Sequence, residues 1–120
     1  MQILGIHHVA LNVVELDEAV SFYERVLGLS ARPDRPADPG PGAWLAGDGF
    51  EVHLSVGETP TRVGQHFAIE VADFDAAFVE ISGSGADVRA PQDSGDRGIR
   101  QFYVADPARN WIEIRERAAL

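Results

Sequence analysis

Apolar and polar residues alternate with a period of two along four stretches of the chain, and two other stretches have helical spacing. Alternation predicts strands with one buried face, because successive side chains of a strand point to opposite sides of the sheet. Apolar residues three and four positions apart predict helices with one buried stripe. The expected elements, in chain order, are 5–13 (strand), 16–27 (helix), 50–56 (strand), 64–71 (strand), about 74–82 (helix) and 110–116 (strand).

Shorter strands complete each half of the chain. We expect them at 29–33, 43–47, 86–91 and 99–105. The pair Asp48-Gly49 stands between two apolar runs and predicts a tight hairpin turn, since Gly accepts the positive φ that such a turn needs. The fold class that follows is α+β, with the order βαβββ occurring twice.

The two halves of the chain also resemble each other residue by residue. HVALNVVELDEAV (8–20) aligns with HFAIEVADFDAAF (66–78) at an offset of 58 residues. Further along, EVHL (51–54) aligns with WIEI (111–114) at an offset of 60 residues. Self-similarity of this kind predicts two copies of one structural unit.

The repeat sets the expected domain organisation. Residues 1–120 should form a single domain, because that length suits one compact core. Its modules are expected at about 1–57 and 64–120. The polar stretch 58–63 contains a proline and is expected to link them.

Strand parity separates a helix-covered face from an open face in each expected sheet. The apolar side chains of the alternating strands, and the aromatic residues Phe22, Tyr23, Phe74 and Phe78, are expected in the core. The other parity places His8, His53, His66 and Glu113 on the face away from the helices. His7 has the helix-facing parity, so we expect it to point away from His8 and to be structural.

Three imidazoles and a carboxylate suit a divalent ion such as Zn, Ni, Co, Fe or Mn. If the two sheets curve toward each other, these side chains converge. We therefore predict one ion held by His8, His66 and Glu113, with His53 as a fourth candidate ligand. Three protein ligands leave open coordination positions, as a catalytic centre requires.

Composition narrows the possible partners. The formal net charge of −9 repels phosphate backbones, so we expect no nucleic-acid binding. The absence of cysteine excludes disulfides and thiolate chemistry. No apolar run is long enough to cross a membrane, and the N-terminus has no signal-peptide pattern, so we expect a cytoplasmic protein.

Four segments together resemble the vicinal oxygen chelate superfamily, which includes glyoxalase I, extradiol dioxygenases and bleomycin resistance proteins. They are IHHVALNV, LDEAVSFYERVLGL, HFAIEV and FYVADPARNWIEI. The resemblance implies two βαβββ modules in a glyoxalase-like open barrel, and a homodimer. It also implies metal ligands at His8, His66 and Glu113, with the family's fourth ligand position falling on His53.

The chain departs from the family pattern at two places. The family turn usually reads DP-D-G-N, whereas this chain has Arg109 where the family has Gly. The glutathione-dependent glyoxalase I enzymes that it resembles carry Arg at the position of Asn12 and Asn at the position of Gly57. The family uses those two residues to anchor glutathione, so we do not expect glutathione recognition to carry over.

Several residues of the open face are candidates for chemistry or substrate contact. Glu113 and Glu70 are the candidate proton carriers, because a carboxylate near a bound substrate can move a proton. Arg115 is a candidate contact for a substrate anion. The expected pocket residues are Asn12, Ser55, Gln101, Tyr103 and Trp111.

Three functions fit these residues. The first is a metal-dependent isomerase or lyase of glyoxalase type, whose ion would chelate two neighbouring substrate oxygens and act as a Lewis acid. The second is an Fe(II) extradiol-type dioxygenase, because two His and one carboxylate form the facial-triad set. The third is a non-catalytic drug-binding protein of bleomycin type, for which the acidic charge would suit a cationic ligand.

Overall fold

The computed structural model describes residues 1–38, 40–59 and 64–117. The chain divides into two compact units, Met1–Thr61 and Arg62–Leu120, which we call module 1 and module 2. The expected linker lies at this division, and its residues 60–63 fall outside the described part of the chain.

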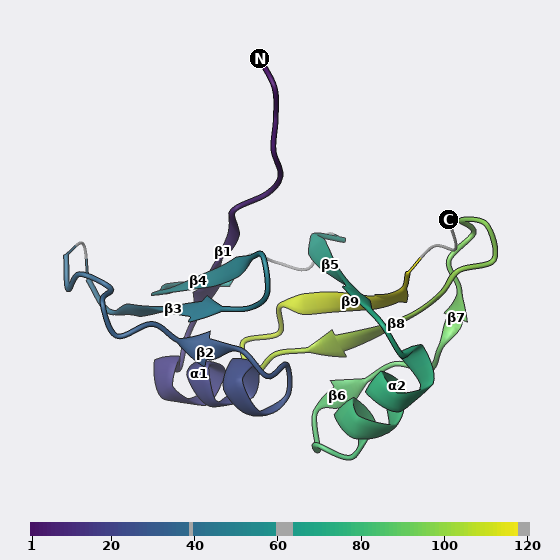
Figure 1. Cartoon of the computed structure of the whole chain (residues 1–120). Coiled ribbons are helices and arrows are strands. Elements are labelled where there is room, and N and C mark those ends of the chain that lie inside the picture. Colours follow the sequence, from purple (N-terminus) through teal and green to yellow (C-terminus); the bar gives the residue numbers. More distant parts are fainter. Residues whose placement is uncertain (39, 60–63, 118–120) are drawn as a thin grey trace. The chain divides into compact units, whose positions relative to one another are not determined.

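Module 1 is a four-stranded sheet with one helix, and its strand order is β1-β4-β3-β2. The parallel pair β1–β4 lies at one edge, and the other pairs are antiparallel. Helix α1 packs on β2, β3 and β4 and covers one face of the sheet (Figure 1). The elements are β1 (His8–Val13), α1 (Leu16–Arg25), β2 (Ser30–Ala31), β3 (Gly42–Ala46) and β4 (Glu51–Val56).

Module 2 repeats this arrangement with the order β5-β9-β8-β6, and the extra short strand β7 pairs with β8. The strands β5 and β9 are parallel, as their counterparts β1 and β4 are. Helix α2 packs on β6 and β9 (Figure 1). The elements are β5 (His66–Val71), α2 (Phe74–Ser82), β6 (Asp87–Val88), β7 (Gln92–Asp93), β8 (Arg100–Ala105) and β9 (Trp111–Glu116). The predicted double βαβββ fold is confirmed, with β7 as an unexpected addition.

The core of each module lies between its sheet and its helix, on the parity that the sequence predicts. Tyr23 is fully buried, Phe22 and Phe74 are nearly so, and Phe78 is half-buried against the ring of Phe102. The sheet contributes side chains that are at most 1% exposed, namely Val13, Leu45, Val52, Leu54, Phe102, Val104, Ile112 and Ile114. Val56, which ends β4, is 46% exposed and is the exception to the expected pattern.

The two helices begin and end differently. The Asp73 carboxylate accepts a hydrogen bond of 3.0 Å from the Ala76 N–H and caps α2, whereas no side chain caps the start of α1 at Glu15. Helix α1 stops at Arg25, earlier than expected, before Gly28 takes a left-handed φ of 71°. No helix in the described part of the chain has the length and apolar character that crossing a membrane would require.

Two strands begin later than the alternation predicts, and the reason is the pairing partner. β1 begins at His8, opposite Glu51, which is the first residue of β4. β5 begins at His66, opposite Trp111, which is the first residue of β9. Before β1, the His7 carbonyl still accepts a hydrogen bond of 3.1 Å from the Glu51 N–H, but the register of both pairs starts at the histidines, so the period-two pattern alone overestimates both strands.

Candidate metal and substrate site

Strand register gives both open faces the same plan. In module 2, His66 lies opposite Trp111, and Glu113 lies between Ala68 and Tyr103. In module 1, the corresponding neighbours are His8 opposite Glu51, and His53 between Ala10 and Trp44. The repeated sequence therefore places each candidate ligand at an equivalent point of its sheet.

His66 and Glu113 face each other in module 2. The His66 Nε2 atom lies 3.3 Å from Glu113 Oε1, and His66 Nδ1 lies 2.9 Å from the Gly64 carbonyl oxygen. A carbonyl only accepts, so Nδ1 carries the proton and the Nε2 lone pair of the neutral ring points toward the carboxylate. Two acceptors in this position need a cation between them or a second proton on the ring.

A divalent ion fits this pair of donors. Nitrogen and oxygen ligands that each lie about 2.1 Å from one ion are themselves about 3–3.5 Å apart. The bond from Nδ1 to Gly64 is the support that metal-binding imidazoles ordinarily receive, because it fixes both the tautomer and the ring plane. The separation of 3.3 Å is therefore compatible with two ligands of one ion, and equally with a direct contact between a protonated His66 and Glu113.

Glu113 is only 6% exposed, and neighbouring side chains hold its carboxylate in place. The Tyr103 hydroxyl donates to Glu113 Oε1 at 3.1 Å, and Arg115 approaches Oε2 at 3.5 Å. Burial raises the pKa of Tyr103, and the Glu113 carboxylate raises it further, so this hydroxyl remains a donor. Arg115 also donates to Asp96 at 3.0 Å, so two carboxylates already engage this candidate anion contact.

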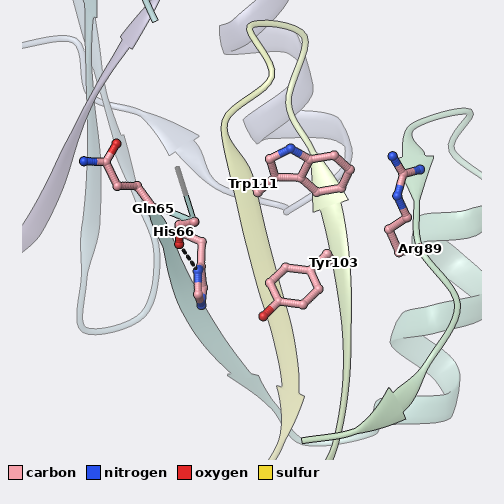
Figure 2. A pocket seen from close by; sticks show the side chains of 6 residues that line it. Gln65, His66, Arg89, Tyr103 and Trp111 are labelled. Carbon is pink, nitrogen blue, oxygen red and sulfur yellow. Dashed lines mark hydrogen bonds between the residues drawn. The ribbon is translucent and has the colours of Figure 1, made fainter. Parts of the chain in front are cut away.

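A pocket of about 240 Å³ opens beside His66 in module 2 (Figure 2). Its aromatic walls include two predicted pocket residues, and the Tyr103 ring meets the His66 ring edge-on at 5.3 Å. The lining residues are Gly64, Gln65, His66, Arg89, Tyr103 and Trp111. The pocket therefore combines one candidate metal ligand, two aromatic rings and one cation.

The imidazoles of module 1 are arranged differently. The rings of His8 and His53 stack with their centres 3.9 Å apart and an angle of 13° between their planes. The Trp44 ring also stacks on His53, with the ring centres 4.9 Å apart. Nitrogen lone pairs lie in the ring plane, so stacked rings direct them side by side and not to one point. The His53 Nε2 atom lies 2.8 Å from Glu51 Oε1, whose carboxylate also receives two bonds from Arg32.

His7 was expected to point away from His8, and this expectation was wrong. The two Nδ1 atoms lie 2.8 Å apart, and the His7 ring also meets the His53 ring edge-on at 6.3 Å. His7 precedes β1, so strand parity does not govern it. Desolvation and the neighbouring rings of His53 and His7 lower the pKa of His8, which favours the neutral form that a metal ligand needs.

The other predicted site residues lie on the expected faces but do not line the described pocket. Asn12 donates through its side-chain amide to the Glu58 carbonyl at 3.0 Å. Ser55 is exposed opposite Asn12 in the register. Glu70 is exposed and Gln101 is half-buried, and both lie opposite Arg115. Their proposed roles stay predictions.

The structure adds residues that the sequence reading did not single out. Glu51 binds His53, and the signal for it was its shared parity with that histidine on the same strand. Arg89 lines the pocket just after β6, and nothing in the alternation pointed to it. Both contacts depend on side-chain conformation, which periodicity does not encode.

Within the described residues, no group of three or more His, Asp or Glu side chains is arranged to hold a metal ion. The centre predicted from the sequence draws His8 from module 1 and His66 and Glu113 from module 2. The full ligand set, including His53, therefore stays a prediction, and His66 and Glu113 are the two predicted ligands that contact each other directly.

Two βαβββ modules with open sheets define the glyoxalase-like class of α+β proteins. The chain belongs to the Glyoxalase/Bleomycin resistance protein/Dioxygenase superfamily, whose sequence model matches residues 5–114. This superfamily includes glyoxalase I and fosfomycin-modifying enzymes. Its members typically use a divalent metal and bind small molecules. The resemblance seen in the sequence is confirmed.

Individual relatives share the fold along nearly the whole chain. A protein of Arabidopsis thaliana named Glyoxylase I 4 is 27% identical over 124 residues, which covers 95% of this chain and 71% of the relative. The crystal structure of a protein assigned to the glyoxalase family from Bacillus anthracis is 26% identical, with a TM-score of 0.83 and 98% of both chains covered. TnmS3, an antibiotic-binding protein from Streptomyces sp. CB03234, has a TM-score of 0.81 at 21% identity, covering 98% of this chain and 99% of TnmS3, and shares the fold.

Proposed function

We propose that this protein is a metal-dependent isomerase or lyase of glyoxalase type that binds a small substrate through two neighbouring oxygens. His8, His66 and Glu113 would hold one divalent ion, with His53 as a further candidate ligand that would first have to leave its stack on His8. The observation that carries the proposal is the separation of 3.3 Å between His66 Nε2 and Glu113 Oε1, beside a pocket of about 240 Å³.

The residues around the proposed ligands have supporting roles. The Gly64 carbonyl holds His66 in the tautomer whose Nε2 lone pair faces Glu113. The Tyr103 hydroxyl donates a hydrogen bond that fixes one carboxylate oxygen of Glu113, and as a neutral group it does not cancel the charge of that carboxylate. A bound divalent ion would supply Lewis-acid stabilisation of negative charge on substrate oxygens.

Proton transfer would fall to the carboxylates of module 2. Glu113 is next to the pocket wall through Tyr103, so it is the first candidate to accept a substrate proton, which requires it to leave the ion transiently. Glu70 is the second candidate, since it shares the face of His66 on β5 and is exposed to solvent. Replacement of each by Gln, once a substrate is in hand, separates the two roles.

We further propose that the substrate is not a glutathione adduct. Asn12 and Gly57 replace the glutathione-anchoring residues, and they lie side by side, because a Cβ on Gly57 would be 3.4 Å from the Asn12 side chain. The Asn12 amide donates to the backbone carbonyl of Glu58 at 3.0 Å, which holds its side chain at this corner.

The oligomeric state and the compartment are also proposals. The family resemblance supports a homodimer, and the acidic, cysteine-free composition is compatible with a reducing cytoplasm. Size-exclusion chromatography with light scattering gives the mass in solution directly, and a monomer at working concentrations would rule out the dimer.

An extradiol-type Fe(II) dioxygenase is the second candidate function. Two imidazoles and one carboxylate, here His8, His66 and Glu113, are the ligand set of non-haem Fe(II) oxygenases. Bound iron together with oxygen uptake on catechols would favour this candidate. Stoichiometric Ni, Co or Zn without oxygen uptake would favour the isomerase or lyase.

Metal analysis of the purified full-length protein tests the shared premise of both candidates. We expect about one divalent ion per chain in the wild type, and loss of that ion in His66→Ala. His7→Ala is the comparison variant: it removes an imidazole that contacts His8 but is no proposed ligand, so it should weaken metal binding without abolishing it. Retained metal in His66→Ala, with a folded far-UV spectrum, would contradict the assignment. A metal-free wild type that binds a cationic antibiotic tightly would instead support the drug-binding function.

A further inference from the structure

We propose that Arg89 forms an anion-binding subsite in the module 2 pocket, so that the natural ligand is a small, flat molecule with a carboxylate at one end. The inference rests on the proposed function in one respect, namely that this pocket receives the substrate. Figure 2 shows His66 and Arg89 on opposite sides of the pocket, with Tyr103 and Trp111 between them. The strand order β5-β9-β8-β6 explains this arrangement, because each residue lies on or next to a successive strand.

The local charge at this end of the pocket is positive. Arg89 pairs with Asp87 at 2.7 Å, and Arg109 pairs with the other oxygen of the same carboxylate at 2.8 Å. Two guanidinium groups therefore share one carboxylate, and within the described residues no second acid is paired with either of them, in a chain whose net charge is −9. An anionic ligand at Arg89 would complete the charge balance.

Arg32, the equivalent arginine of module 1, has a guanidinium that is fully engaged by acidic side chains. The backbone N–H of Arg32 donates to the Trp44 carbonyl at 2.8 Å, and the backbone N–H of Arg89 donates to the Tyr103 carbonyl at 2.8 Å. The two arginines therefore occupy equivalent positions in their sheets. Arg32 makes hydrogen bonds to both Asp34 and Glu51, and its side chain is 31% exposed. The Arg89 side chain is 51% exposed and shares its only described carboxylate with another arginine.

The guanidinium of Arg89 is also oriented before any ligand arrives. It lies over the Trp111 ring at 4.8 Å, and Asp87 fixes one of its nitrogens. A planar guanidinium presents parallel N–H groups that match the two oxygens of a carboxylate. The half-buried Tyr103 ring then offers a wall for a flat apolar part between that carboxylate and the His66 end, whereas Trp111 is 5% exposed and serves mainly to hold Arg89.

Arg109 contributes to this subsite from outside the pocket. Its φ of 71° lies in the left-handed region, which is unfavourable for most residues other than Gly. The Arg109 guanidinium lies 5.3 Å from the centre of the Trp111 ring and binds Asp87. Because Arg109 binds one of the two Asp87 oxygens, Asp87 neutralises less of the positive charge of Arg89. Arg109 therefore acts on the ligand through Arg89 and is a positioning residue.

The test titrates the full-length protein with benzoate and with benzamide by calorimetry. The two probes share a flat ring and differ in the charge of the head group. Arg89→Gln is the test variant, and Arg97→Gln is the control, because it removes the same charge from an exposed loop of the same module. Each titration is repeated after chelator treatment, so that benzoate held by a metal is distinguished from benzoate held by Arg89.

We expect the wild type to bind benzoate about tenfold or more tightly than benzamide, because a charge-assisted hydrogen bond replaces a neutral one. Arg89→Gln should abolish this preference, and Arg97→Gln should keep it, with or without chelator. Arg109→Gly should weaken benzoate binding about threefold and leave benzamide binding unchanged, which a purely structural role would not do.

Four results would overturn the subsite. They are equal affinity for both probes in the wild type, an unchanged preference in Arg89→Gln, an equal loss in Arg97→Gln, or a preference that disappears when metal is removed. The subsite and the proposed function fail separately. A metal-free wild type whose benzoate preference depends on Arg89 would reject the metal chemistry alone, whereas a metal-loaded wild type without that preference would reject the subsite alone.

Discussion

The two modules place different chemistry on the same framework. Each has a histidine at the start of its first strand, His8 or His66, and each has a parallel edge pair of strands in the same register. In module 1 the next positions across the sheet carry Glu51 and His53, whereas in module 2 they carry Trp111 and Glu113. The acid and the aromatic ring have therefore exchanged places between the repeats.

This exchange decides which neighbours meet. In module 1 the acid lies beside His53 and binds it at 2.8 Å, so the histidine pair stacks and one imidazole is already engaged. In module 2 the acid lies two residues further along its strand, where it faces His66 at 3.3 Å beside the pocket. The duplicated fold thus pairs the acid with a different imidazole in each half: Glu51 with His53 in module 1, and Glu113 with His66 in module 2.

The largest expected effect concerns the shared framework. Leu54 and Ile114 are equivalent core positions, and each is 1% exposed. Replacing either by Ala should lower the free energy of unfolding by about 2–5 kcal/mol, because a cavity adds to the lost apolar burial. Urea denaturation measures both, and a cost below about 1 kcal/mol for only one of them would show that the modules do not share equivalent cores.

The next effect separates the two open faces. Tyr103 and Trp44 are equivalent positions, but only the Tyr103 hydroxyl donates to a proposed ligand, Glu113. Tyr103→Phe should weaken metal affinity by about 10–100-fold, as loss of outer hydrogen bonds to metal ligands usually does. Trp44→Phe keeps an aromatic ring on His53 and should leave metal affinity unchanged. Competition with a chromogenic chelator measures both, and equal affinities in the two variants would contradict the assignment.

A smaller effect distinguishes the helix starts. Asp73→Ala removes the cap of α2 and should cost about 1 kcal/mol of stability. Glu15→Ala, at the equivalent start of α1, removes no side-chain cap and should cost close to nothing. Thermal unfolding of both variants tests the difference, which would be refuted by a larger loss in Glu15→Ala.

The smallest effect is a dependence of stability on pH. Arg100 makes hydrogen bonds to Glu116 and lowers the pKa of that carboxyl below its usual value of 4.5, whereas the equivalent residue of module 1 is Val56. A lowered pKa means that the contribution to stability is complete above the unfolded value and is lost as the pH falls through the folded value. Glu116→Gln should therefore make the melting temperature less dependent on pH between about pH 5 and pH 3. An unchanged acid slope would show that this pair does not contribute.

The sequence predicted the elements that depend on periodicity. Alternation placed His66 and Glu113 on one face, and helical spacing located α2 at its observed bounds. It could not predict contacts that depend on strand ends and rotamers. His7 meets His8 because it lies outside the strand, and Arg109 takes the left-handed turn position because Asp106 and Asn110 close that turn through hydrogen bonds.

The position of the metal is the most direct test of the account. Crystals of the full-length protein loaded with Ni²⁺ or Co²⁺ would give an anomalous difference peak at the metal absorption edge. We expect that peak within bonding distance of both His66 Nε2 and Glu113 Oε1, with His8 completing the protein ligands. A peak that leaves His66 and Glu113 uncoordinated, or no peak in crystals of protein shown to contain the metal, would contradict it.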